Sequence, residues 1–202
     1  MYVRRYAATA RAAPYGVGMA FAPIETDRLV LRAMTPGDAE PLAVRRSDPE
    51  TAMYQAWTIP YPLERARELV ASVADMDGPT RGEWFQVAIV ESASGAGVGD
   101  VAVRLSDNGH LAEVGYTLNP EARGRGFAKE AAAAMIDHLV TVVGVHRLEA
   151  ETDPRNEASG RVLRRLGFAL EGIRREAYLL DGVVSDSAIW GLLARDWRGA
   201  QS

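Results

Sequence analysis

The 202 residues are 48% hydrophobic and 25% charged, which is typical of one folded globular domain. The formal net charge of −4 disfavours a nucleic-acid-binding surface, and no apolar run reaches the length that spans a bilayer. The absence of cysteine excludes disulfides and favours a reducing compartment, so we expect a cytoplasmic protein. Three histidines without metal-ligand spacing predict no metal site.

The first 22 residues differ in composition from the rest. They contain three arginines, many small residues and no acidic residue. Targeting peptides share this composition, and so do plain N-terminal extensions, while Met19 offers an alternative start. We expect residues 1–22 to be a flexible extension ahead of a domain that covers residues 23–199.

From Ile24 onward the hydrophobic pattern alternates between the periods of strands and helices. Thr35 and Asp38 form a capping-box pattern that predicts a helix start, and Asp181-Gly182 predicts the turn of a final hairpin. We expect strands at 24–33, 84–91, 98–105, 111–118 and 147–151, and helices after Thr35, after Pro62, at 125–143 and at 156–166. The short turns between the strands at 84–118 predict an antiparallel meander.

A glycine-rich turn connects the strand at 111–118 to the long helix. It contains Arg123, Gly124, Arg125, Gly126, Phe127 and Ala128. Glycine permits positive φ and close approach, and the first N–H groups of a helix lack internal partners, so this turn can hold phosphate. The alternative is a plain strand-to-helix turn. The spacing matches neither a P-loop nor a Rossmann fingerprint.

The turn resembles the acyl-CoA motif [R/Q]-x-x-G-x-[G/A] of the GNAT acetyltransferase superfamily. Four further stretches resemble its RimJ/RimL branch, and the resemblance spans about residues 24–197. These stretches are Thr26-Asp27-Arg28-Leu29-Val30-Leu31-Arg32, Glu113-Val114-Gly115-Tyr116, Asn156-Glu157-Ala158-Ser159 with Leu166-Gly167-Phe168, and Asp181-Gly182 followed by Asp186 and Trp190.

The resemblance implies an α/β fold with a mixed, mostly antiparallel sheet flanked by helices. Two strands, ending near Leu118 and beginning near Arg147, would splay apart and hold acyl-CoA between them. Pantetheine would pair with the main chain near Tyr116, Thr117 and Leu118, and the pyrophosphate would lie on the turn at 123–128. Asn156 and Ser159 would provide further contacts to coenzyme A.

The resemblance also implies transfer of an acetyl group from acetyl-CoA to a primary amine. The acceptor could be a protein N-terminal α-amine, as in ribosomal-protein acetylation, or a small-molecule amine such as an aminoglycoside. Succinyl-CoA as the donor and a non-catalytic acyl-CoA sensor are further alternatives. The terminal hairpin could offer the edge of a homodimer.

At neutral pH only about one alkylamine in a thousand is unprotonated, so the reaction needs a base. We expect Glu113 to be this base, and main-chain N–H groups near Leu118 to stabilise the oxyanion. Leu163 occupies the place of the tyrosine that protonates the thiolate in many GNAT enzymes, which leaves Ser159, Tyr116 or Tyr178 as the acid.

Three aromatic residues lie close to the second helix in the sequence and are candidates for the acceptor pocket. Trp57 and Tyr61 lie in a proline-rich loop, where aromatic side chains often bind ligands, so we expect both to line this pocket. Trp84 opens a strand, and we expect it to pack in the core.

Overall fold

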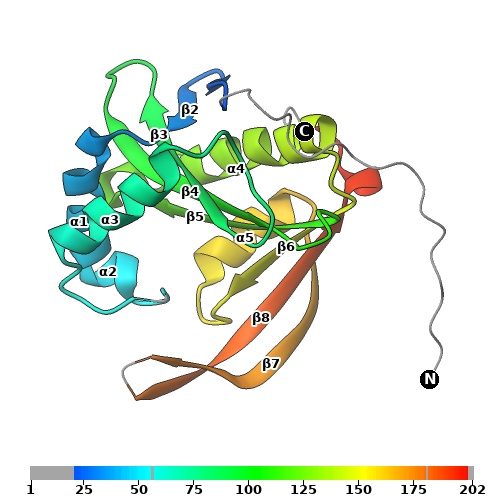
Figure 1. Ribbon diagram of the computed structural model, residues 1–202. Coiled ribbons are helices and arrows are strands. Elements are labelled where there is room, and N and C mark those ends of the chain that lie inside the picture. Colours follow the sequence, from blue (N-terminus) through cyan, green and yellow to red (C-terminus); the bar gives the residue numbers. More distant parts are fainter. Residues whose placement is uncertain (1–20, 56, 181, 200–202) are drawn as a thin grey trace.

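The computed structural model describes residues 21–55, 57–180 and 182–199. One eight-stranded sheet runs through the molecule in the order β1-β2-β3-β4-β5-β6-β8-β7 (Figure 1). All neighbouring strands are antiparallel except β5 and β6, which confirms the expected mixed sheet. The strands are β1 (Ile24–Glu25), β2 (Leu29–Ala33), β3 (Trp84–Glu91), β4 (Gly97–Leu105), β5 (Leu111–Leu118), β6 (Arg147–Thr152), β7 (Ala169–Leu180) and β8 (Val183–Leu193).

Helices cover both faces of the sheet (Figure 1). The first group follows β2 and consists of η1 (Pro36–Asp38), α1 (Ala39–Ser47), α2 (Pro49–Ala52) and α3 (Leu63–Ala74). The second group consists of η2 (Pro120–Ala122), α4 (Phe127–His138), its π-helical continuation η3 (Leu139–Val143) and α5 (Glu157–Arg165), and η4 (Ala194–Asp196) follows the last strand. The expected capping box is present, since the Thr35 N–H donates to Asp38 Oδ2 over 2.7 Å.

The alternation of side chains along β3 separates two hydrophobic cores. Phe85, Val87 and Ile89 lie in the larger core, which includes Phe127 and Met135 of α4. Ala88 points the other way, into a smaller core beneath α1 and α3. Because successive side chains of a strand face opposite sides, one strand supports both layers.

The packed domain begins slightly before the strand at Ile24. Phe21 falls within the expected extension, yet it is buried, and its ring lies edge-on to Phe85 with centroids 5.2 Å apart. Residues 1–20 and Asp181 lie outside the described residues.

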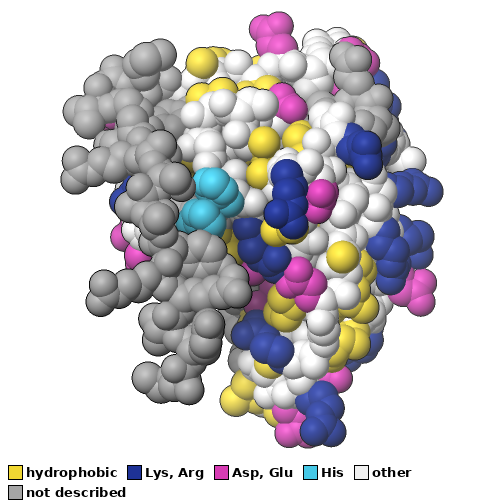
Figure 2. Space-filling model, turned by 90° about the vertical axis from the view of Figure 1, so that its right-hand side faces the viewer, with side chains coloured by type: hydrophobic (Ala, Val, Ile, Leu, Met, Phe, Trp, Pro, Cys, Tyr) yellow, Lys and Arg dark blue, Asp and Glu magenta, His cyan; other side chains and the backbone are white. Residues whose placement is uncertain are grey.

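The surface mixes both signs of charge. On the face obtained by turning Figure 1 by 90°, Lys and Arg side chains are interspersed with Asp and Glu (Figure 2). Of the helices in the described ranges, none has the length and apolar character needed to cross a membrane. The described residues also contain no group of three or more candidate metal-ligating side chains.

Gly99 of β4 lies directly against the end of β5. A Cβ atom at this position would lie 2.3 Å from the Thr117 carbonyl oxygen and 2.7 Å from Leu118 Cδ2. We therefore expect Gly99→Ala to lower the free energy of unfolding by about 1–3 kcal/mol, because the two strands must move apart. Gly97→Ala, where nothing lies within 4 Å, is the matched control and should melt within a degree or so of wild type. Thermal denaturation of the two variants measures the difference, and equal melting temperatures would contradict this account.

Candidate active site

The sheet opens into a fork between β5 and β6. The two parallel strands pair only at their beginnings, through Leu111 with Arg147, Ala112 with Leu148, and Glu113 with Glu149. Beyond Glu113 the strands diverge, while β5 remains paired with β4 as far as Leu118. The expected splayed pair is therefore present, and β5 has one open edge.

The direction of the main-chain groups along β5 follows from its pairing with β4. Leu111 accepts a hydrogen bond from Ser106 N, and Asn119 N donates to Val98 O. Because the N–H and C=O of a strand residue point to the same side and alternate along the strand, the odd-numbered positions face β4. Val114, Tyr116 and Leu118 then present their main-chain groups to the fork.

A cavity of about 730 Å³ occupies the fork. The residues that border it from β5 are Glu113, Val114, Gly115, Tyr116 and Thr117, and those from β6 and its continuation are Glu151, Thr152, Asp153 and Arg155. Further walls come from α1, from the segment that follows α2, from β3 and β4, and from the β7–β8 hairpin. The volume is that of a small-molecule site with room for several chemical groups.

Glu113 stands at the base of the fork. Arg104 is its partner across β4 and β5, and Arg104 Nη2 donates to Glu113 Oε2 over 2.8 Å. The Glu113 side chain is 25% exposed, and no hydrogen bond from the described residues engages Oε1. The carboxylate thus borders the cavity with one oxygen available to a proton.

The three aromatic residues differ from one another in their surroundings. Trp57 borders the cavity, and its Nε1 donates to the Arg46 carbonyl oxygen over 2.8 Å. Tyr61 is only 5% exposed and packs in the smaller core, so it supports the wall from behind rather than lining it. The core placement expected for Trp84 is wrong: it is 43% exposed and borders the cavity, because strand alternation turns Phe85 inward and Trp84 outward.

The glycine-rich turn lies at the far end of β5 and begins α4. Gly124 and Gly126 have φ of 73° and 83°, in the left-handed region that favours glycine. Gly126 is the N-cap of α4, and no side chain caps the helix. The helix dipole and the uncapped first turn therefore give this end of α4 the properties of an anion site.

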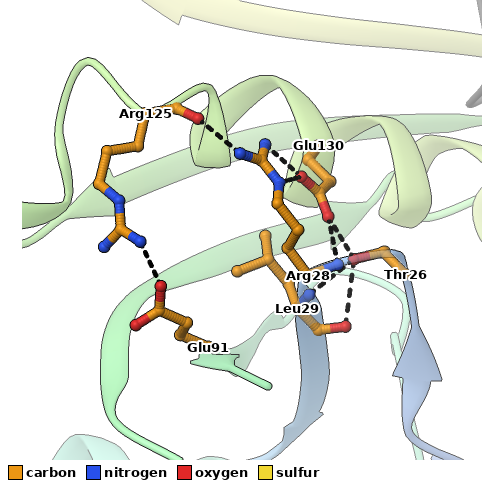
Figure 3. Close-up of polar contacts among 6 residues, drawn as sticks. All are labelled: Thr26, Arg28, Leu29, Glu91, Arg125 and Glu130. Carbon is orange, nitrogen blue, oxygen red and sulfur yellow. Dashed lines mark hydrogen bonds and ion pairs between the residues drawn. The ribbon is translucent and has the colours of Figure 1, made fainter. Parts of the chain in front are cut away.

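Residues just before β2 hold this turn in place. Arg28 Nη1 donates to the Arg125 carbonyl oxygen over 3.0 Å, and Thr26 Oγ1 donates to Glu130 Oε1 over 2.6 Å (Figure 3). Burial raises the pKa of Glu130, but hydrogen bonds from Thr26 and Arg28 outweigh burial, and the net pKa lies below its usual value. Thr26 and Arg28 thus hold the first turn of α4.

The two arginines of the turn are already paired with acidic residues. Arg125 forms an ion pair with Glu91 (Figure 3). Its guanidinium also lies 4.3 Å from the centroid of the Phe127 ring. Arg123 Nη1 lies 3.0 Å from Glu50 Oε2, and its Nη2 also contacts Asp48. Either side chain would have to exchange its partner to contact a phosphate, so the turn offers chiefly its main chain.

Asn156 and Ser159 lie across the fork from β5, outside the cavity lining. Asn156 caps α5, since its Oδ1 accepts a hydrogen bond from Ser159 N over 3.1 Å. Tyr116 OH donates to the Ser159 carbonyl oxygen over 3.3 Å, so it joins the two sides. Leu163 is buried in the larger core.

The candidate acids differ in their suitability. Burial raises the pKa of Tyr116 to about 12. A thiol has a pKa near 8.5, so proton transfer from Tyr116 to a thiolate would be strongly uphill. Burial, and then the charge of Glu151, raise the pKa of Tyr178 as well. Neither tyrosine is matched to protonating a thiolate at neutral pH.

Several polar residues of the cavity were not predicted. Glu151 accepts hydrogen bonds from Ser187 and from Arg174, the latter over 2.6 Å, and Asp153 forms an ion pair with Arg155. Arg46 and Gln86 also border the cavity. Glu151 and Asp153 could have been suspected from their place on the diverging strand, but only the fold brings the hairpin residues to them.

Comparisons with known proteins agree with this geometry. The family model described as an acetyltransferase (GNAT) domain matches residues 28–169. An uncharacterized N-acetyltransferase p20 of Bacillus licheniformis is 32% identical over 174 residues, which cover 86% of this chain and 97% of that protein. The [ribosomal protein uS5]-alanine N-acetyltransferase of Escherichia coli is 34% identical over 88 residues, covering 44% of this chain and 45% of that protein.

The fold is also found among solved structures. A GNAT-family acetyltransferase from Bacillus anthracis superposes with a TM-score of 0.75 at 22% identity, covering 86% of this chain and 99% of that one. GNAT acetyltransferases use acetyl-CoA, and the fork, the open edge of β5 and the uncapped start of α4 fit this cosubstrate. From the matched domain and the full-length relative, we conclude that this chain belongs to the GNAT family of N-acetyltransferases.

Proposed function

We propose that the protein transfers an acetyl group from acetyl-CoA to a primary amine held in the cavity of the fork. The observation that carries the proposal is the end of the β5–β6 pairing at Glu113, which places a carboxylate beside the cavity and an open main-chain edge directly after it. A protein N-terminal α-amine is the proposed acceptor, on the strength of the partial match to the uS5-alanine enzyme. A small-molecule amine is the second candidate, since the cavity measures about 730 Å³.

The open edge of β5 explains how the pantetheine arm would be held. The amides of the pantetheine arm would pair with the main chain of Tyr116 and Leu118, and the pyrophosphate would lie against Gly124, Gly126 and the start of α4. Phe127 and Ala128 provide the first N–H groups of the helix. Thr117, whose main chain faces β4, borders the cavity instead.

Glu113 is the proposed base because one of its oxygens is available. Glu151, the other glutamate of the cavity, receives Ser187 on Oε1 and Arg174 on Oε2, so both of its oxygens are occupied. Acceptance of the ammonium proton by Glu113 Oε1 leaves a neutral amine to attack the thioester carbonyl. N–H groups on the open edge stabilise the resulting oxyanion. Collapse of the intermediate breaks the C–S bond, and the departing thiolate takes up the proton that the attacking nitrogen loses as the amide forms.

The C-terminal hairpin is the proposed edge of a homodimer. Its exposed hydrophobic side chains include Ile173, Leu179, Val183 and Val184, each at least half exposed. β7 is also the outermost strand of the sheet, with β8 as its single neighbour. Both features favour association with a second copy.

The base assignment is tested by Glu113→Gln. The substitution keeps the shape of the side chain but removes the base, so kcat/KM at neutral pH should fall by about 10²-fold or more. The deficit should shrink as pH rises toward the pKa of the acceptor amine, because solution then supplies the neutral form. Release of free thiol from acetyl-CoA measures the rate. Thiol release that requires the amine would also show that the protein is an enzyme and not an acyl-CoA sensor.

Glu149→Gln is the matched control for this variant. Glu149 is the register partner of Glu113 on β6 and is likewise paired with an arginine, Arg147, yet it does not border the cavity. We expect nearly wild-type turnover from this control. Normal turnover by Glu113→Gln at pH 7 would show that the amine loses its proton elsewhere.

The phosphate site is tested by Gly126→Val. A β-branched residue cannot easily adopt φ of 83°, and its side chain would hold a pyrophosphate away from the main chain. The affinity for coenzyme A, measured by calorimetry, should fall at least about tenfold. Gly144→Val, with φ of 79° and open surroundings at the other end of the same helical segment, should lose similar stability but keep its affinity. If the two variants bind coenzyme A with equal affinity, the glycine-rich turn is not part of the cofactor site.

A further inference from the structure

Arg46 of α1 is a buried cation that borders the cavity. The residue is 8% exposed. Its Nη1 donates to Tyr61 OH over 3.0 Å, and its guanidinium carbon lies 4.4 Å and 5.0 Å from the ring centroids of Trp57 and Tyr61. Nε has no hydrogen-bond partner. Within the described part of the chain, no carboxylate lies within ion-pair distance of this guanidinium.

The neighbouring arginine shows a buried cation whose charge is paired, although its Nε also lacks a hydrogen-bond partner. Arg45 is 5% exposed, and its Nη2 lies 2.5 Å from Asp100 Oδ1. Gln86 donates to the other oxygen of Asp100, and Arg45 also donates to Asn119. A buried charge is normally paired, because desolvation is otherwise uncompensated. Arg46 differs from Arg45 in that its counter-charge is missing and in that it faces the cavity.

We propose that Arg46 binds a carboxylate carried by the acceptor, so that the substrates are amines that also bear an acid. This inference rests on the proposed acetyl transfer. A planar guanidinium binds a carboxylate through charge-assisted hydrogen bonds, and Nη2 of Arg46 is the nitrogen that neither donates to Tyr61 nor is fully buried. Cation–π contacts with Trp57 and Tyr61 fix its plane before the ligand arrives.

The remaining charges of the cavity favour a carboxylate over a more highly charged anion. Besides Arg46, the basic residue that borders the same space is Arg155, which is paired with Asp153. The acidic residues, Glu113 and Glu151 among them, would repel a phosphate dianion. They suit the ammonium end of a zwitterion, whose carboxylate meets Arg46. Two sources offer this chemistry: the carboxylate of a free amino acid, and an acidic side chain near the N-terminus of a protein.

The test compares matched acceptors that differ only in charge. One pair is an ω-amino acid and its primary amide, and the other is a peptide with aspartate next to its N-terminus and the same peptide with asparagine. Wild type should favour each acid over its amide by at least about tenfold in kcat/KM, mainly through KM. In Arg46→Gln this preference should fall close to unity. The pair that shows the preference identifies the source of the carboxylate.

Two further variants control for structural effects. Arg65→Gln removes a guanidinium that lies 5.2 Å from the centroid of the same Tyr61 ring but does not border the cavity, and it should keep the preference. Arg46→Lys keeps the positive charge but not the planar guanidinium, and it should retain part of the preference for the acid. It replaces Arg46→Gln in the test if Arg46→Gln does not fold. A purely structural Arg46 predicts equal losses for acid and amide.

The outcomes separate this inference from the proposed function. Amine-dependent thiol release with equal kcat/KM for acid and amide would keep the acetyl transfer and overturn the carboxylate site. If no amine supports thiol release, calorimetry of the ω-amino acid and its amide on the protein saturated with coenzyme A decides the inference alone, and equal affinities overturn it. If Arg46→Gln instead slows only the transfer from succinyl-CoA to a neutral amine, Arg46 binds the carboxylate of the donor, and the proposed acceptor site is overturned.

Discussion

The divergence of β5 and β6 after three residue pairs is the constraint on which the rest of the site depends. A parallel pair that continued to Leu118 would satisfy the main chain of Val114, Tyr116 and Leu118 and leave no space between the strands. Because the pairing stops at Glu113, a carboxylate, an open hydrogen-bonding edge and a cavity occur next to one another. The start of α4 lies at the end of the same open edge.

Arginine holds the elements around this fork in place. Arg28, just before β2, is paired with Glu130 of α4. Arg125 and Arg123 connect the glycine-rich turn to the end of β3 through Glu91 and to α2 through Glu50. The last connection joins the cofactor side to the segment after α2 that borders the cavity. Arg46 differs from these arginines, because it contacts the aromatic residues Trp57 and Tyr61 and forms no ion pair with a described carboxylate.

Much of the architecture could be predicted from the sequence because periodicity and turn residues report local structure directly. The meander at 84–118, the strand at 147, the helix after Asn156 and the hairpin all occur within a residue or two of their expected positions. The long helix is less regular, since its last turn is π-helical from Leu139. For Trp84 the information was present in the alternation with Phe85, and the aromatic character of the residue was wrongly given more weight.

The polar lining of the site could not be predicted in the same way. Arg45 and Arg46 are adjacent and chemically identical, and only the packing of α1 against β4 and against the loop at 57–61 gives one of them a carboxylate and the other two aromatic rings. Likewise, Ser187 reaches Glu151 only because β8 pairs with β6.

The position of β8 in the sheet also determines when the sheet can be completed as the chain is synthesised. β8 is the last strand to be made, yet it lies between β6 and β7 and pairs with both. A nascent chain that ends before Val183 therefore has a β7 without its neighbour and a β6 paired only through three residues of β5. Until the final strand emerges, both edges are open to pairing with other chains, and the wall formed by Ser185 and Ser187 does not exist. The wall that β8 contributes to the cavity is thus the last part of the fork to be synthesised.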